Sequence, residues 1–299
     1  MITVIGSIGF DLTTISDRLP RPGETLVGTG FVSGPGGKGA NQALAACRAG
    51  AVTRMVGAVG SDAFAPQALA LLKDGGVDLS AVKAVDGATG IALIFVGGTG
   101  ENMIVIAQGA NARVTPQQAI AAPLAKGDHL LLQLEIPLEA VASAITQARN
   151  AGARSLLNTA PFHPGAVPLM MEADITVANE TEFDLACEAM GLNSPGRKAR
   201  MADFVKRSGR AIIVTLGGDG AIAATPDGFV SVEALKIKPV DTVGAGDTFC
   251  GFLGAALDAG ANLETAMRHA SAAGSLACLK PGAQPAIPSK QDVDAALRA

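Results

Sequence analysis

The residues most suited to chemistry lie near the C-terminal end, in the stretch DTVGAGDTFCGFLGAAL from Asp241 to Leu257. Gly244, Ala245 and Gly246 stand directly before Asp247, and apolar residues recur after it at three- and four-residue spacing, which predicts an amphipathic helix. A glycine turn that opens a helix leaves backbone N–H groups unpaired, and with the positive end of the helix dipole they form a site for an anion such as phosphate. The dipole also favours an ionised carboxylate, so we expect Asp247 to act as a general base toward a hydroxyl placed beside the anion.

The alternative for Asp247 is an ordinary helix N-cap, which is a common role for aspartate. That role explains the aspartate, but neither the glycines on both sides of Ala245 nor the second acid, Asp241, six residues earlier. The combination favours a motif with a chemical function.

A second glycine-rich stretch, GPGGKGANQA, runs from Gly34 to Ala43. Its glycines match the dinucleotide spacing G-x-G-x-x-G, with Asp62 downstream, but the preceding segment does not have the pattern of a buried first strand. The phosphate-loop pattern G-x-x-x-x-G-K-[ST] is absent. We interpret the stretch as a glycine turn that opens a helix over residues 40–49, where Lys38 and Asn41 hydrogen-bond to sugar-like hydroxyls.

Further polar residues follow predicted strands. Glu135 comes after LLLQL, and Asn179, Glu180 and Glu182 come after a strand that ends near residue 177. The carboxyl ends of strands bind ligands in open α/β sheets, and carboxylates there suit a hydrated Mg²⁺. The glycine turn TLGGDG, 215–220, suits a nucleotide, whereas the three histidines are at unrelated spacings and are interpreted as structural.

Helical and extended patterns alternate along most of the chain. From residue 116 onward we predict helices over 116–124, 138–150, 180–190 and 197–207, and strands over 129–133, 154–158, 174–178 and 211–215. This alternation predicts an α/β fold, a doubly wound and mostly parallel sheet flanked by helices. Segments near 9–33 and 90–106, including predicted strands over 25–32 and 90–96, fall outside this rhythm. We expect them to form a small β-sheet lid on a single domain, 1–299.

Composition and charge limit the classes of partner that this chain is expected to bind. The chain has 299 residues, 48% of them hydrophobic, with a net charge of −4 and no basic block, so nucleic acid is not an expected partner. No apolar run reaches membrane-spanning length, the N-terminal MITVIGS does not have the pattern of a signal peptide, and the four cysteines have no metal or redox spacing. We therefore expect a cytoplasmic protein. Because Trp and Tyr are absent, a flat ligand base would have to lie between aliphatic side chains.

Across nearly its whole length the chain resembles the ribokinase-like (PfkB) carbohydrate kinases. The resemblance rests on GSIGFD at 6–11, PGETL at 22–26, GGKGANQA at 36–43, TGIALIFV and GEN between 89 and 102, GAN at 109–111, QLEIP at 133–137, NETE at 179–182, TLGGDG at 215–220, DTVGAGDTF at 241–249 and KPGAQPAIP at 280–288. The stretch around Asp247 is highly specific for this family.

The resemblance implies transfer of the γ-phosphoryl group of Mg·ATP to a sugar hydroxyl, with D-ribose and its 5-hydroxyl as the first choice. Asp247 would be the base, and the backbone N–H groups of residues 243–246 the anion hole. The implied sugar-binding residues are Asp11, Gly37, Lys38, Gly39, Asn41, Glu135 and Asp247. The implied ATP-binding residues are Asn179, Thr215, Leu216, Gly217, Gly218, Asp219, Gly220, Gly246 and Ser271, with Glu182 holding Mg²⁺ through water. A K⁺ site is implied at Asp241, Val243, Ala277, Lys280, Gly282 and Ala286.

Three positions depart from the pattern of the ribose-specific members of the family. Gly9 stands where an Asn touches the sugar, Ser271 replaces a His beside the adenine, and Ala286 replaces a Ser at the K⁺ site. The alternatives are therefore another pentose, a ketohexose or a nucleoside as acceptor. A non-catalytic sugar-binding protein and a dinucleotide-dependent oxidoreductase are further alternatives. The apolar lid predicts a homodimer that forms through it.

Overall fold

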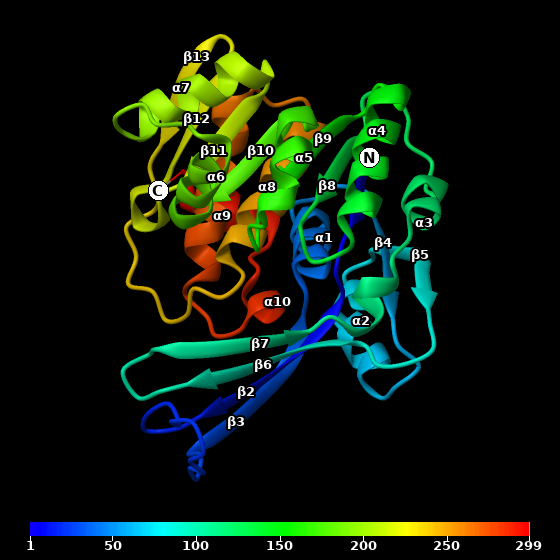
Figure 1. Cartoon of the computed structure of the whole chain (residues 1–299), viewed down its shortest axis with the longest axis vertical. Helices are drawn as coiled ribbons and strands as arrows, with labels where there is room; N and C mark the ends of the chain where they lie inside the picture. Colours follow the sequence, from blue (N-terminus) through cyan, green and yellow to red (C-terminus); the bar gives the residue numbers. More distant parts are fainter. Residues whose placement is uncertain (299) are drawn as a thin grey trace.

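The computed structural model describes residues 1–298, and its main element is a nine-stranded sheet (Figure 1). The strand order is β13-β12-β11-β10-β9-β8-β1-β4-β5. The seven strands from β11 to β5 run parallel, while β12 and β13 are antiparallel additions at one edge. Their bounds are β1 Ile2–Ile5, β4 Thr53–Val59, β5 Asp78–Ala84, β8 His129–Leu132, β9 Arg154–Asn158, β10 Ile175–Asn179, β11 Ala211–Thr215, β12 Ala221–Thr225 and β13 Gly228–Val232.

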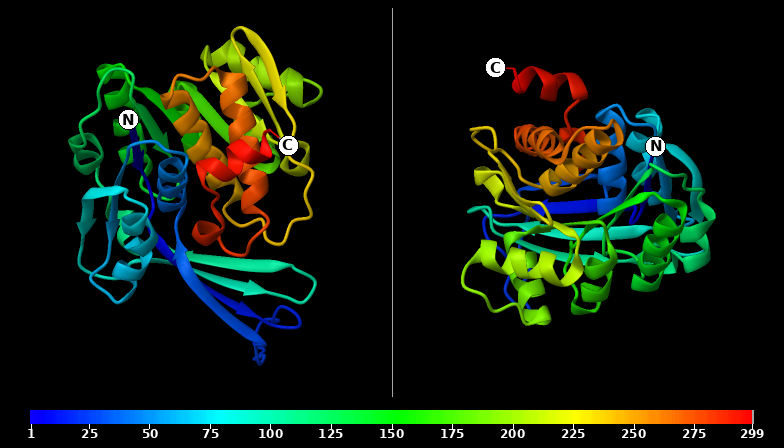
Figure 2. Two further views of the ribbon diagram at one scale, coloured as in Figure 1. Left: turned by 180° about the vertical axis from the view of Figure 1, so that it is seen from behind. Right: turned by 90° about the horizontal axis from the view of Figure 1, so that it is seen from above.

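Helices cover both faces of this sheet, as the view from above shows (Figure 2). One face packs against α1 Lys38–Arg48, α2 Phe64–Asp74, α8 Ala245–Asp258, α9 Leu263–Ala277 and α11 Lys290–Ala296. The other packs against α3 Pro116–Ala121, α4 Leu138–Ala151, α5 Val167–Glu172, α6 Glu180–Met190 and α7 Arg197–Ser208. Because both faces are covered, the central strands are continuous apolar segments without alternation.

A second, four-stranded sheet projects from this body (Figure 1). Its order is β3-β2-β6-β7, with β2 Gly9–Ile15, β3 Gly30–Gly36, β6 Gly90–Val96 and β7 Asn102–Ala107. It continues directly from the main sheet, since β2 begins four residues after β1 ends and β3 ends two residues before α1 begins. In Figure 1 the short helix α10, Ala283–Ala286, lies close to this sheet.

The predicted α/β class with its large, mostly parallel sheet is confirmed. Several local predictions were wrong. Residues 25–29 are not strand, and the strand lies later, over Gly30–Gly36, because pairing with β2 holds even its glycines extended. The edge strands β5, β12 and β13 and the helix α9 were not predicted.

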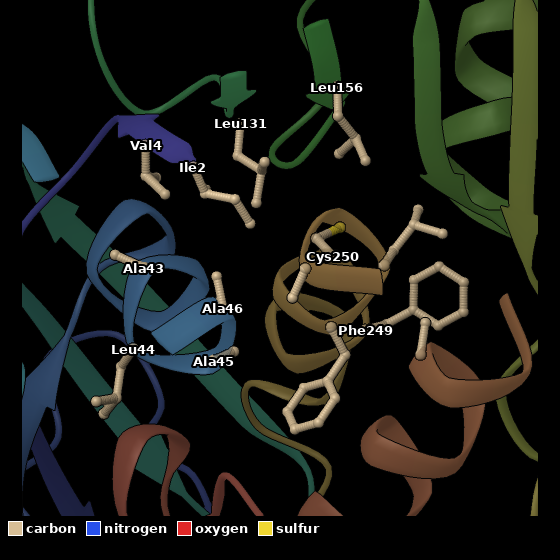
Figure 3. Packing of buried hydrophobic residues seen from close by; sticks show 14 of the residues in the cluster. Ile2, Val4, Ala43, Leu44, Ala45, Ala46, Leu131, Leu156, Phe249 and Cys250 are labelled. Atoms are coloured by element: carbon tan, nitrogen blue, oxygen red, sulfur yellow. The ribbon is translucent and has the colours of Figure 1, made fainter. Parts of the chain in front are cut away.

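Small residues allow helices α1 and α8 to lie side by side against the sheet (Figure 3). A Cβ on Gly251 of α8 would lie 2.4 Å from the Cβ of Ala45 and 2.7 Å from the carbonyl oxygen of Gln42, both on α1. Only a glycine allows this approach. The contact fixes the first turn of α1 relative to the first turn of α8, which is where the candidate site residues lie.

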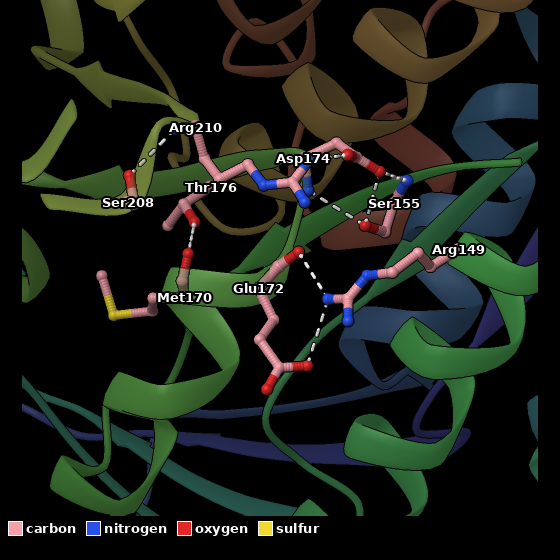
Figure 4. Close-up of polar contacts among 8 residues, drawn as sticks. All are labelled: Arg149, Ser155, Met170, Glu172, Asp174, Thr176, Ser208 and Arg210. Atoms are coloured by element: carbon pink, nitrogen blue, oxygen red, sulfur yellow. Dashed lines mark hydrogen bonds and ion pairs between the residues drawn. The ribbon is translucent and has the colours of Figure 1, made fainter. Parts of the chain in front are cut away.

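Polar contacts tie the strand beginnings together on the edge of the sheet opposite the site (Figure 4). Arg210 donates to Asp174 over 2.5 Å, and the backbone N–H of Ser155 donates to the same carboxylate over 2.9 Å. These residues precede or begin β11, β10 and β9. The more exposed pair of Arg149 and Glu172 contributes little, as is usual for surface ion pairs. Within residues 1–298, no helix has both the length and the apolar character needed to cross a membrane.

Candidate active site

The candidate site lies at the carboxyl ends of the central parallel strands, around β1. The chain runs from β1 outward to β4 and β5 on one side and returns through β8, β9 and β10 on the other. Such a reversal of strand order opens a crevice at the carboxyl edge of a sheet. The residues that follow these strands meet there: Ser7 after β1, Gln133 and Glu135 after β8, Thr159 after β9, and Glu182 after β10.

The turn before α8 presents backbone N–H groups to this crevice. Gly244 is the N-cap with φ 76°, and a Cβ there would lie 2.9 Å from the Cβ of Ala283, so only glycine suits the position. The N–H of Val243 donates to Asp241 and that of Ala245 to the carbonyl of Thr242. The predicted anion hole of residues 243–246 is therefore wrong in these two members.

The N–H groups of Gly246 and Asp247 have no partner among residues 1–298, and the space beside Gly246 is open. They are the donors that point out of the first turn of the helix, where the dipole also favours an anion. Asp247 is the third residue of α8, so it is not the N-cap that the alternative interpretation required.

The carboxylate of Asp247 is buried, with 6% of the residue exposed, and each of its oxygens accepts from an amide on α1. Asn41 donates through Nδ2 to Oδ2 over 2.9 Å, and Gln42 donates through Nε2 to Oδ1 over 3.0 Å. The Oδ1 atom of Asn41 is buried and has no partner in the described part of the chain. It is thus available to accept from a ligand hydroxyl. A carboxylate oxygen accepts about two hydrogen bonds, so Asp247 also keeps acceptor capacity for a substrate.

Two further acids lie near Asp247. Burial, and then the charges of Glu135 and Asp247, raise the pKa of Asp11 to about 6. Glu135 is held in place because the hydroxyl of Ser7 donates to it over 2.6 Å and the backbone N–H of Lys38 donates over 3.1 Å. The structure therefore brings the predicted sugar-binding acids Asp11, Glu135 and Asp247 close to one another.

Lys38 supplies the opposite charge. The attraction of Asp247, and secondarily of Glu135 and Glu182, raises the pKa of Lys38 although burial opposes the shift. Its ammonium group is thus charged and is attracted both by acids on the predicted sugar side and by an acid on the predicted nucleotide side.

The glycines of GGKGAN serve close backbone packing. Gly37 has φ 88°, and a Cβ there would lie 2.7 Å from the backbone N of Gly9. A Cβ on Gly39 would lie 2.6 Å from the backbone N of Ser7, and the N–H of Gly39 already donates to the Ser7 hydroxyl. The N–H of Gly39 is thus engaged by Ser7, which follows β1, and the predicted contact of Gly39 with a sugar stays a prediction. Gly34 and Gly36 lie in β3, so the dinucleotide interpretation of this stretch was wrong.

A cavity of about 330 Å³ opens between β11, α8 and α9. Thr215, Gly217, Gly218 and Gly220 line it together with Gly246 and Ser271, so these six predicted ATP-binding residues surround one space that ends at the first turn of α8. Leu216 and Asp219 do not line it. Leu235, Ile237, Pro239 and Phe249 do, and they supply mostly aliphatic walls for a flat base.

Asn179 and Glu182 form a capping box at the start of α6. Asn179 accepts from the N–H of Glu182 over 2.8 Å, and the Oε2 atom of Glu182 accepts from the N–H of Asn179 over 3.1 Å and from Thr159 over 3.4 Å. Burial raises the pKa of Glu182. Its Oε1 atom accepts no hydrogen bond within residues 1–298, and no cluster of three metal-ligating side chains is found there. A single carboxylate with a free oxygen fits a hydrated Mg²⁺ that is held mainly by phosphate and water. Asn179 caps the helix α6 and does not line the cavity predicted to bind ATP.

Asp241 joins the two segments predicted to hold K⁺. Its Oδ1 accepts from the N–H of Val243 over 3.0 Å, and its Oδ2 accepts from the N–H of Gly282 over 2.8 Å. Ala277 is the last residue of α9, where carbonyl groups lack helical partners and the dipole favours a cation. Ala286 is buried in α10 and Lys280 is exposed between the two helices. The predicted K⁺ site stays a prediction, since the contacts of the Asp241 carboxylate within residues 1–298 are with backbone N–H groups.

Gln42, Ser7 and Asn158 belong to the site but were not predicted. Gln42 directly follows Asn41 in α1. A glutamine among the alanines of a helix that packs on the sheet could have indicated a buried polar contact. Ser7 and Asn158 follow or end apolar strands, as Glu135 does.

Comparison with known proteins agrees with this geometry. A model of the pfkB family of carbohydrate kinases matches residues 1–290. The chain is 36% identical to a ribokinase from Schizosaccharomyces pombe, over 98% of this chain and 96% of that protein. It is 35% identical to a deoxyribokinase from Salmonella typhi, over 96% of this chain and 95% of that protein. The solved structure of Arabidopsis thaliana ribokinase complexed with ribose and ATP has a TM-score of 0.89 and 30% identity, covering 100% of this chain and 98% of that one. With the same fold, an intact glycine turn and a buried aspartate beside it, this chain belongs to the pfkB family of carbohydrate kinases.

Proposed function

We propose that this protein is an ATP-dependent ribose kinase that transfers the γ-phosphoryl group of ATP to the 5-hydroxyl of D-ribose. The observation that carries the proposal is the position of Asp247. Its carboxylate lies in the first turn of α8, next to Gly246, which lines the cavity that suits ATP, and close to Asp11 and Glu135, whose carboxyl groups suit the hydroxyls of a sugar.

In the proposed reaction the sugar hydroxyl lies against Asp247 and the γ-phosphate against the N–H groups of Gly246 and Asp247. The hydroxyl oxygen forms a bond to the γ-phosphorus, its proton moves to Asp247, and the bond from that phosphorus to the bridging oxygen of ADP breaks. The two N–H groups stabilise the charge on the transferring group, and the ammonium of Lys38 adds to this effect. Asp11, Glu135 and the free Oδ1 of Asn41 accept from other sugar hydroxyls and orient the substrate.

Mg²⁺ and K⁺ are part of this proposal. Mg²⁺, when bound with ATP, would neutralise phosphate charge, and Glu182 would hold its water shell. K⁺ would lie between Asp241 and the carbonyl groups of residues 277–286, where it would stiffen the two segments that support the glycine turn. Turnover should then be faster in K⁺ than in Na⁺ buffer, and equal rates in K⁺, Na⁺ and a bulky organic cation would contradict the cation site. Because Ala286 has no side-chain oxygen, the stimulation should be modest.

A deoxyribokinase and a ribokinase are similar to this chain to nearly the same extent, so 2-deoxyribose is the main competitor for ribose. Another pentose, a ketohexose or a nucleoside would use the same chemistry.

An ADP-release assay over ribose, 2-deoxyribose, other pentoses, ketohexoses and nucleosides tests the function. We expect the highest kcat/KM with ribose. The Asp247→Asn variant should lose about 10²- to 10⁴-fold in kcat while sugar binding, measured by calorimetry, stays nearly unchanged. If this variant keeps more than half of the wild-type kcat, Asp247 is not the base.

A further inference from the structure

A set of buried amides connects the central sheet to Asp247. Gln133 donates through Nε2 to Oε1 of Gln42 over 2.6 Å. Gln42 donates through Nε2 to Oδ1 of Asp247 over 3.0 Å and to Oδ1 of Asn158 over 3.2 Å. Asn158 donates to the carbonyl oxygen of Val177 over 3.2 Å. Gln42 and Gln133 are 0% exposed, and Asn158 is 7% exposed.

The partners at both ends of the set determine which way each amide points. An ionised carboxylate only accepts, so Gln42 must turn its NH₂ group toward Asp247, and its oxygen then faces the NH₂ of Gln133. The carbonyl of Val177 also only accepts, so Asn158 must turn its oxygen toward Gln42. One orientation of each amide satisfies all these contacts, and it aims an N–H of Gln42 at Asp247.

Gln42 differs from Asn41, which holds the other oxygen of the carboxylate. Asn41 keeps a buried acceptor that has no partner among residues 1–298, which leaves it able to bind the proposed sugar directly. Gln42 is wholly enclosed, with its oxygen bonded to Gln133 and its NH₂ shared between Asp247 and Asn158. It therefore reaches the reaction only through Asp247.

The carboxylate needs such support because the last torsion of aspartate is broad and intrinsically poorly defined. Asp247 can keep one orientation only if its oxygens are fixed by donors. We propose that Gln42 is a positioning residue for phosphoryl transfer. It orients the Asp247 carboxylate through its hydrogen bond to Oδ1 and, being fully buried, contacts neither the sugar nor ATP. This inference rests on the proposed role of Asp247 as the base.

The first test is Gln42→Met, which keeps the volume but removes the donor. Because the lost hydrogen bond is to a charged group, we expect kcat to fall about 10- to 100-fold. The KM and calorimetric Kd for the sugar should stay within about threefold of wild type, because Gln42 does not reach the sugar.

The matched control is Gln118→Met. Gln118 is also buried, with 4% exposed, and donates to the carbonyl of Gly57 over 2.7 Å, far from Asp247 in the fold. It should lose stability as Gln42→Met does, without the fall in kcat. A folded Gln42→Met protein whose kcat is within twofold of wild type would overturn the proposal. So would equal losses of kcat in the two variants.

A second variant, Gln42→Glu, decides the question if the methionine variant does not fold. At low pH the introduced acid is protonated and can donate to Asp247 as the amide does, whereas at high pH two ionised carboxylates face one another. The ratio of wild-type to variant kcat should therefore rise at least about tenfold between pH 6 and pH 9. An activity loss that is the same at every pH would overturn the proposal, because it would indicate that Gln42 acts only through packing, which does not depend on pH.

The activity of Asp247→Asn separates failure of this inference from failure of the proposed function. If that variant is active, the base is wrongly assigned. If it is inactive while both Gln42 variants turn over normally, only the role of Gln42 is wrong.

Discussion

At the scale of single residues, the active site brings three acidic side chains close to one another. Asp11, Glu135 and Asp247 lie close enough for the charges of the last two to raise the pKa of Asp11, while Lys38 lowers it. These acids suit the binding of several hydroxyl groups, but without a ligand their negative charges repel one another. This repulsion lowers the free energy of unfolding when all three are ionised.

Asp11→Asn should stabilise the fold at alkaline pH while weakening sugar binding. The pKa of Asp11 is raised from 3.8 to about 6 in the folded protein, so its contribution to stability is fully present below pH 3.8 and is lost as the pH rises through 6. Removing the charge should raise the free energy of unfolding at pH 8 by about 1–2 kcal/mol, allowing for partial screening of this half-buried carboxyl.

Thermal melts of both proteins from pH 4 to pH 8 measure this effect. The difference in Tm should be positive at pH 8 and vanish near pH 4. In the wild type, kcat/KM for ribose should fall below about pH 6, where Asp11 becomes protonated. A variant that is less stable than wild type at pH 8 would contradict the electrostatic account.

Gly9→Asn tests the missing sugar contact. Gly9 has ordinary extended backbone at the start of β2, so a side chain causes no torsional strain, but its Cβ would lie 3.2 Å from the carbonyl oxygen of Gly90. That neighbour must shift by a few tenths of an ångström. If it does, the added amide should lower KM for ribose by about 2- to 12-fold, the value of one neutral hydrogen bond. The measurement is kcat/KM for ribose, with a thermal melt as the folding control.

A different result for Gly9→Asn would concern the substrate alone. If the folded variant shows no gain with ribose, and wild type uses another sugar or nucleoside at least tenfold better, ribose is not the acceptor. The kinase activity would stand.

Among the elements, α1 and α8 hold most of the chemistry, and glycines set their positions. Gly251 lets the two helices touch, Gly37 lets the start of α1 pack on β2, and Gly244 turns the chain into α8. The catalytic groups are then carried on first helical turns that are fixed against one sheet.

Gly244→Ala should impair catalysis more than stability alone explains. The left-handed φ of 76° costs a non-glycine residue about 1–2 kcal/mol, and the new Cβ would also push against Ala283, 2.9 Å away. Relief of this clash moves the turn that presents Gly246 and Asp247, so kcat should fall at least tenfold.

Gly260→Ala is the matched control for this turn. Gly260 follows the other end of α8 with φ 86°, and open space surrounds its Cβ position. It carries similar backbone strain without a clash, so its stability should fall by about 1–2 kcal/mol while kcat stays unchanged. Similar kcat values in the two variants would show that the turn geometry does not limit the reaction.

At the scale of the whole molecule, the four-stranded sheet exposes a group of large apolar side chains. Met103, Ile104, Val105 and Ile106 of β7 are each about half exposed, although successive residues point to opposite faces. Apolar side chains are thus exposed on both faces. We propose that one face covers the sugar as a lid and the other pairs with the same sheet of a second copy, which gives a homodimer.

Light scattering during size-exclusion chromatography tests this assembly. Wild type should elute as a dimer at micromolar concentration, and a charge on the paired face should produce a monomer. Ile104→Glu and Val105→Glu probe opposite faces of β7, and Val52→Glu, at a 73% exposed apolar residue outside this sheet, is the control. A monomeric wild type would contradict the dimer. Dimers in both β7 variants would place the interface elsewhere.

Features that depend only on neighbouring residues could be predicted from the sequence alone. The apolar strands, the amphipathic helix after Asp247 and the glycine turn before it have local patterns, and the α/β class follows from their alternation. The same reasoning pointed to Lys38, Asn41, Glu135 and Asp247 as candidate residues, and the resemblance to the carbohydrate kinases added Asp11. The fold brings these residues close to one another.

Features that depend on pairing between distant segments could not be predicted from the sequence and are seen in the folded chain. The glycines at 34 and 36 are extended because β2 pairs with them, against their weak local preference for strand. The N–H of Val243 is unavailable to an anion because Asp241 folds back onto it. Gln42 reaches Asp247 because Gly251 lets α8 approach α1, across more than 200 residues of chain. Local sequence preferences cannot predict such contacts, because the free energy that favours them arises only when the helices pack together.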